Sequence, residues 1–178
     1  MSADASTLRL FSPAGALRSA VALRRAAERL AGLGFAVEID EAATARAQRF
    51  AGDDDVRLAT LARVAAARPS VALATRGGYG LTRLLDRIDW KRIAASVAAG
   101  TRWVGMSDMT SLQLGLLAHA VEGAVTWAGP LAVDDFGRAE EDGGVDDVTQ
   151  GCFLEAMSGE LEAVGFRTEA GFDGLEKK

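Results

Sequence analysis

The sequence contains few of the residues on which covalent cross-links and metal sites depend. Its 178 residues include one cysteine, Cys152, and one histidine, His119. A single cysteine excludes an intrachain disulfide and any zinc site built from several thiolates. We therefore expect a protein of a reducing compartment, in which Cys152 lies on a helix and packs as a small apolar core residue.

The chain also lacks the long apolar stretch and the basic excess that membranes and nucleic acids require. No run approaches the roughly 18 uninterrupted apolar residues of a membrane span, and Met1–Thr7 has neither the charged start nor the apolar run of a signal peptide. The 20 Lys and Arg residues are outnumbered by 25 Asp and Glu, for a net charge of −5, which disfavours binding to phosphate backbones. We expect a cytoplasmic protein with a small or peptidic partner, and with no membrane or nucleic-acid partner.

Short apolar runs alternate with segments of helical periodicity along most of the chain. Alternation of this kind is typical of an α/β domain with a parallel sheet, whose ligands gather at the carboxyl ends of the strands. Strands are expected at 8–11, 35–39, 71–74, 102–104 and 125–128, and helices at 17–33, 53–67, 109–121 and 147–158, with another helix beginning over 81–86.

Two further segments lack clear periodicity. The stretch 134–147 is dense in Asp, Glu and Gly, and we expect a solvated loop there because its acidic residues form no recognisable metal-ligand pattern. No element is expected over 167–178.

Ser107 gives the strongest chemical signal. It lies in Gly105-Met106-Ser107-Asp108, between an expected strand and an expected helix. A sharp strand-to-helix turn exposes a nucleophile, and the helix N-terminus and the amide after the serine favour developing negative charge. The lipase-type motif has glycine two positions beyond the serine, where this chain has Met109, so a simple helix cap is the competing interpretation.

A second candidate segment is the turn Arg76-Gly77-Gly78-Tyr79-Gly80. Its glycines allow the backbone to approach a ligand closely, and its arginine is suited to holding a carboxylate; the competing interpretation is a plain tight turn. A nucleotide-binding domain is a weaker alternative, because the third glycine of the dinucleotide fingerprint and the Gly-Lys-Ser/Thr triplet of a P-loop are both missing.

Together with several other motifs, these two turns make the chain resemble the LD-carboxypeptidases, the S66 serine peptidases that include the microcin-immunity hydrolases. The matching segments, in order, are Ser12-Pro13-Ala14, Phe50-Ala51-Gly52 followed by Arg57 and Leu61, the 76–80 turn followed by Arg83-Leu84-Leu85, Gly105-Met106-Ser107-Asp108-Met109-Thr110, Gly129-Pro130 and Asp135-Phe136-Gly137.

The resemblance implies an N-terminal domain like that of class I glutamine amidotransferases, a flavodoxin-like three-layer domain, which we assign to residues 1–165. It implies hydrolysis of the L,D-amide bond of murein tetrapeptide, with release of D-alanine, and neither a metal nor a cofactor; a microcin-like peptidyl-nucleotide is the alternative substrate. The residues implied are the nucleophile Ser107, the oxyanion-hole residues Gly77, Gly78 and Asp108, and the substrate contacts Arg76, Tyr79 and Met106.

The sequence offers no evident general base for Ser107. If one helix carries both residues, His119 lies twelve positions past Ser107, a rise of roughly 18 Å, and we expect it to be a surface or packing residue. The resemblance places the true glutamate and histidine in a C-terminal domain, with residues 166–178 as a tail or the start of the linker to it. A non-catalytic binding module therefore remains the alternative, and an uncovered apolar surface predicts homodimers or self-association.

Overall fold

The structure is a computed structural model that describes residues 6–119 and 124–163. This part contains five strands and five α-helices. They are β1 (Thr7–Phe11), α1 (Ala20–Gly32), β2 (Ala36–Ile39), α2 (Asp54–Ala67), β3 (Val71–Ala74), α3 (Trp90–Ala98), β4 (Arg102–Gly105), α4 (Met109–His119), β5 (Trp127–Ala128) and α5 (Asp147–Ser158). The expected boundary between residues 165 and 166 lies outside the described residues.

The strands form one parallel sheet in the order β2-β1-β3-β4-β5. This order is that of flavodoxin-like folds, in which the chain reverses direction across the sheet between β1 and β3. The expected α/β fold is thereby confirmed. Ligands of such sheets bind beyond the carboxyl ends of the strands at the reversal, so the segments that follow β1 and β3 come first as candidates for a site.

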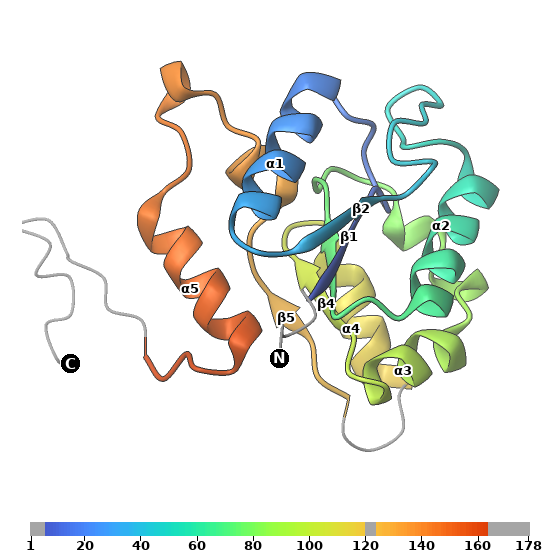
Figure 1. The fold of residues 1–178 in the computed structure, drawn as a ribbon. Helices are drawn as coiled ribbons and strands as arrows, with labels where there is room; N and C mark the ends of the chain where they lie inside the picture. The colour runs from blue at the N-terminus through green and yellow to red at the C-terminus, as the bar shows by residue number, and fades with distance from the viewer. Residues whose placement is uncertain (1–5, 120–123, 164–178) are drawn as a thin grey trace, which may run out of the picture.

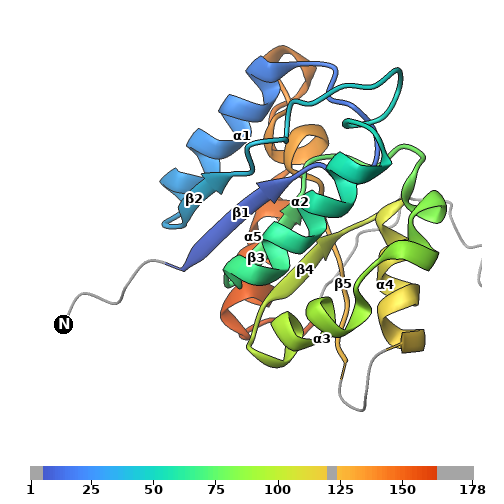
Figure 2. The same cartoon turned by 90° about the vertical axis from the view of Figure 1, so that its right-hand side faces the viewer.

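Helices cover both faces of the sheet and complete three layers (Figures 1 and 2). On one face, α2, α3 and α4 bury a core that contains Phe11 and Trp103, whose rings meet edge to face at 5.3 Å. On the other face, α1 and α5 cover a core that contains Leu10, Phe136 and Phe153. No helix in the described residues is both long enough and apolar enough to cross a bilayer.

Three sequence expectations are corrected by the structure. The helix expected to begin over 81–86 is instead two short 3-10 turns, and α3 starts only at Trp90, where Asp89 caps it by accepting a hydrogen bond from Arg92 N at 3.0 Å. The stretch 134–147, expected to be a loop, includes most of a π-helical turn over Ala132–Phe136 and a 3-10 turn over Glu140–Asp142. The last strand, expected over 125–128, is paired only at its final two residues.

The start of α4 lies unusually close to the sheet because β4 ends in glycine. A Cβ at Gly105 would lie 2.8 Å from Cγ of Met109 and 3.1 Å from Cβ of Ala74. The Gln113 side chain then ties α4 to two strands by donating to the carbonyls of Gly105 at 2.9 Å and Trp127 at 2.8 Å. The turn between β4 and α4 is therefore held firmly at the carboxyl edge.

Asp40, which directly follows β2, forms a two-pronged ion pair with Arg63 of α2, in which the carboxylate is buried and the guanidinium is partly exposed. The Nε and Nη2 atoms of Arg63 donate to the two carboxylate oxygens at 3.0 and 2.7 Å. Burial alone would raise the pKa of Asp40, but the hydrogen bonds from Arg63 and from the Ala42 amide outweigh burial and hold the pKa below its ordinary value of 3.8. Ionisation of Asp40 therefore stabilises the folded state.

This pair predicts acid-sensitive stability. Because the pKa of Asp40 is lower in the folded state than in the unfolded one, its contribution is present above about pH 4 and is lost as the pH falls through the folded-state pKa. We expect Asp40→Asn to lower the free energy of unfolding at pH 6, with a smaller difference from wild type at pH 3. Urea titrations of wild type, Asp40→Asn, Arg63→Gln and the double variant measure the coupling, and a coupling independent of pH would contradict the prediction.

Candidate active site

Ser107 lies on the turn that joins β4 to α4 and adopts a strained backbone conformation. Its φ is 62°, in the left-handed region that L-residues other than glycine, asparagine and aspartate rarely enter. The residue is exposed at the carboxyl edge of the sheet, and hydrogen bonds from Met109 N to the Met106 carbonyl and from Thr110 N to the Ser107 carbonyl close the turn at 3.3 and 3.0 Å. The geometry is that of a nucleophile elbow, in which strain presents a hydroxyl to the solvent.

Gly77, which follows β3, lies directly against this serine. A Cβ at position 77 would lie 2.7 Å from Cβ and 2.8 Å from Oγ of Ser107, closer than real Cβ contacts allow. Gly15, after β1, completes the contact: its amide donates to the Gly77 carbonyl at 3.1 Å. Glycine thus lets the ends of β1, β3 and β4 meet around one hydroxyl group, which is the location expected from the strand order.

Two backbone amides beside Ser107 are available to a ligand. Within residues 6–119 and 124–163, no acceptor takes the N–H of Gly78 or of Asp108. The carboxylate of Asp108 instead accepts from Leu81 N at 2.9 Å and ties the serine turn to the glycine turn. Gly78 has φ of 112°, a conformation that glycine adopts without strain. The structure thus brings the predicted residues Gly77, Gly78 and Asp108 together at Ser107.

Arg76 and Tyr79 lie on the same glycine turn but differ in how far their side chains are exposed. Arg76 is half-buried, and its Nη1 donates to the Ala16 carbonyl at 2.9 Å, which holds the guanidinium beside Gly15 and Gly78. Tyr79 is 49% exposed and leans toward the ring of Phe50, with centroids 6.3 Å apart. Both side chains remain candidates for substrate contact.

A buried arginine packs against the last glycine of the glycine turn. Arg57 is fully buried and binds the carboxylate of Asp54 and, at 3.5 Å, the Pro13 carbonyl. Its Nη1 lies so close to Gly80 that a Cβ there would approach it to 2.4 Å. Asp54 also pairs with Arg83, whose hydrogen bond is the main cause of the lowered pKa of Asp54. Sequence reasoning gave Arg57 no role of its own, although a charge at an otherwise apolar helical position was a usable signal.

His119 packs against α3 and does not lie at the Ser107 turn. It lies at the other end of α4 and stacks on Trp90 of α3, with ring centroids 5.1 Å apart and planes 12° from parallel. In the part of the chain that the structure describes, no side chain forms a hydrogen bond with Ser107 Oγ. The same part holds no group of three metal-ligating side chains.

The model of the LD-carboxypeptidase N-terminal domain of the S66 peptidases matches residues 8–129. The chain belongs to this family. The match runs from β1 to the glycine after β5 and includes both turns that meet at Ser107.

Known relatives agree with the family. SCO6489 of Streptomyces coelicolor, which is named as a carboxypeptidase, is 41% identical over 99 residues. The match covers 52% of this chain and 30% of that protein. Muramoyltetrapeptide carboxypeptidase of Oxalobacter formigenes is 31% identical with a TM-score of 0.74, covering 86% of this chain and 48% of its own. An MccF-like protein of Bacillus anthracis is 25% identical with a TM-score of 0.76, covering 87% and 45%. The chain thus spans about half the length of these solved structures.

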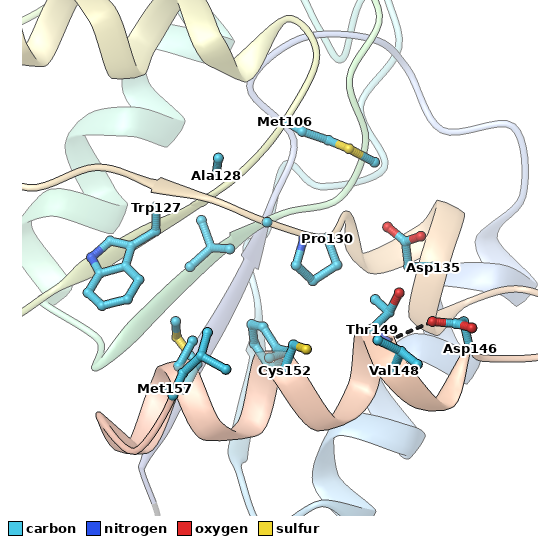
Figure 3. A pocket seen from close by; sticks show the side chains of 15 residues that line it. Met106, Trp127, Ala128, Pro130, Asp135, Asp146, Val148, Thr149, Cys152 and Met157 are labelled. Carbon is cyan, nitrogen blue, oxygen red and sulfur yellow. Dashed lines mark hydrogen bonds between the residues drawn. The ribbon is translucent and has the colours of Figure 1, made fainter. Parts of the chain in front are cut away.

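An apolar groove of about 660 Å³ opens beside the serine turn of this S66 domain, between β5 and α5 (Figure 3). Met106, 43% exposed, stands at its end nearest Ser107, and the ring of Trp127 lines the other end together with Met157. Cys152 is half-buried on the groove wall, so its expected place in the core is only partly realised. The predicted substrate residue Met106 therefore belongs to the serine turn and also lines a cavity of ligand size.

The Gly77 contact predicts a stability cost for any side chain. We expect Gly77→Ala to lower the free energy of unfolding by about 1–3 kcal/mol, because the new methyl group overlaps Ser107. The matched control is Gly32→Ala at the end of α1, where a Cβ meets nothing within 4 Å and a neutral or small stabilising effect is expected. Urea unfolding measures both variants, and equal stability of the two would contradict the described contact.

Proposed function

We propose that this chain is the nucleophile-bearing part of a cytoplasmic serine LD-carboxypeptidase. The reaction proposed is hydrolysis of the L,D-amide bond of murein tetrapeptide with release of D-alanine, as in cell-wall recycling. The observation that carries the proposal is the strained Ser107 turn, packed against Gly77 with the amides of Gly78 and Asp108 unoccupied. Family membership and the 31% identity to a muramoyltetrapeptide carboxypeptidase support the substrate class.

In this proposal Ser107 Oγ attacks the carbonyl carbon of the scissile amide. The carbonyl oxygen becomes an oxyanion, which the N–H groups of Gly78 and Asp108 stabilise where the charge develops. The C–N bond then breaks, D-alanine leaves with a proton on its amine, and water hydrolyses the resulting ester. A base must take the hydroxyl proton and return it to the leaving amine, and no described residue is placed to do so. We propose that this base lies in the C-terminal part of the full-length relatives, outside the half that this chain matches.

Catalysis by Ser107 is tested by joining this chain to the C-terminal part of the Oxalobacter enzyme. The fusion is expected to release D-alanine from murein tetrapeptide, and Ser107→Ala to reduce the rate at least about a thousandfold without changing the melting temperature much. Unchanged release by the Ser107→Ala fusion would refute the assignment of the nucleophile. A peptidyl-nucleotide of the microcin type, the substrate class that the resemblance to the microcin-immunity hydrolases leaves open, is assayed in parallel to decide between the two substrate classes.

A second candidate function is a non-catalytic binding module of the same fold. It is favoured by the lack, among the described residues, of any hydrogen bond that would activate Ser107. A fluorophosphonate probe separates the two candidates, because it labels activated serines. Labelling of the 178-residue chain that disappears in Ser107→Ala would exclude the non-catalytic module.

We also propose that the chain associates with itself through apolar side chains on α4. Leu114 is 61% exposed and Leu117 is 49% exposed on that helix. Burying such a patch against a second copy removes apolar surface from water. Light scattering should therefore show a mass that rises with concentration, and Leu114→Glu with Leu117→Glu should restore the monomer. A wild-type monomer at every concentration would contradict the proposal.

A further inference from the structure

Three arginines at the carboxyl edge of the sheet lack carboxylate partners. These are Arg46, Arg49 and Arg76, and no carboxylate oxygen of the described residues lies within 4.0 Å of their guanidinium nitrogens. Several arginines on or near α2 are paired instead: Arg57 and Arg83 with Asp54, Arg63 with Asp40 and Arg87 with Asp55. In a chain with a net charge of −5, a group of uncompensated cations at one place is informative about what binds there.

All three arginines are anchored to the segment that follows β1. Arg76 donates to the Ala16 carbonyl at 2.9 Å, and Nη2 of Arg46 donates to the Leu17 carbonyl. The carbonyl of Arg49 accepts from Ala16 N at 2.8 Å. The preceding residue, Gly15, donates to the Gly77 carbonyl, and Gly77 touches Ser107. A short chain of contacts thus connects the arginines to the serine.

Arg49 is exposed, as is Arg46, and its guanidinium is held in place by aromatic rings. Its guanidinium carbon lies 5.4 Å from the centroid of the Phe50 ring and 5.3 Å from that of Tyr79. Stacking of this kind restrains the side chain while leaving its N–H donors open to a ligand. Because Tyr79 belongs to the glycine turn, Arg49 sits on the rim of the proposed oxyanion hole.

We infer that Arg49, with Arg46 and Arg76, forms an anion-binding site that holds a negatively charged group of the substrate while its amide lies at Ser107. An extended peptide spans roughly 3.3–3.6 Å per residue, so a charged group one or a few residues from the scissile bond can extend toward Arg49. The planar guanidinium favours carboxylates and phosphates through paired hydrogen bonds. The statement that the bound anion belongs to the substrate rests on the proposed function. The anion is a peptide carboxylate if the substrate is a murein peptide, and a phosphate if it is a peptidyl-nucleotide.

The test measures binding without turnover, in the 178-residue chain carrying Ser107→Ala. Calorimetry compares murein tetrapeptide as the free acid, the same peptide with its carboxyl groups amidated, and adenosine monophosphate. We expect the free acid to bind at least about tenfold more tightly than the amidated peptide, the range for hydrogen bonds to a charged group. Adding Arg49→Gln should reduce this preference to within about threefold. Arg24→Gln, the same charge change on the exposed face of α1, is the control and should leave it unchanged.

Several results would overturn the anion site: equal binding of acid and amide, no binding of any probe, or a preference that survives Arg49→Gln. If Arg49→Gln fails to fold by circular dichroism, Arg49→Lys and the salt dependence of acid binding replace it, and binding insensitive to both would again overturn the site. Binding of the monophosphate that depends on Arg49, without binding of the peptide acid, identifies the anion as phosphate. Loss of D-alanine release in the fusion, with the acid preference intact, refutes only the proposed function.

Discussion

The contact between Gly77 and Ser107 is the constraint from which the rest of the site follows. The two residues come from different strand ends, and they meet only because β3 and β4 are neighbours and position 77 carries no side chain. That contact fixes the distance between the glycine turn and the serine turn, and the hydrogen bond from Leu81 N to the Asp108 carboxylate holds the two turns together. The available amides, the serine and the arginine rim are all arranged around this junction.

Much of this arrangement was accessible from the sequence because it follows from local patterns. The apolar run Val71–Ala74 could only be a buried strand, and the serine between a short strand and a helix predicted the strained turn. The region 81–87 was not predictable in the same way. Its apolar spacing fits a helix, but Gly80 offers no side-chain cap and Asp89 does, so the regular helix starts later.

Long-range pairing is what local patterns leave out. The burial of Arg57 against Gly80 and the stacking of Arg49 on Tyr79 join segments more than 20 residues apart in the chain. Arg57 at least occupies the apolar face of a helix, whereas nothing in the local sequence of Arg49 distinguishes it from a solvated arginine. Ser107, the open amides of Gly78 and Asp108 and the arginines near them all lie within the matched residues 8–129, whereas no described side chain forms a hydrogen bond with the Ser107 hydroxyl. Substrate binding by this domain and catalysis at Ser107 are therefore separate proposals, each with its own measurement.

The left-handed backbone at Ser107 also has a consequence for which residue evolution would favour at this position. A left-handed conformation costs an ordinary L-residue about 1–2 kcal/mol, and glycine would occupy the same turn without that cost. A lineage evolving for thermal robustness alone would drift toward glycine at position 107. A serine there lowers the stability of the folded state, and the close packing of Gly105 against Met109, with the hydrogen bond from Gln113 to the Gly105 carbonyl, holds the turn in place against that cost.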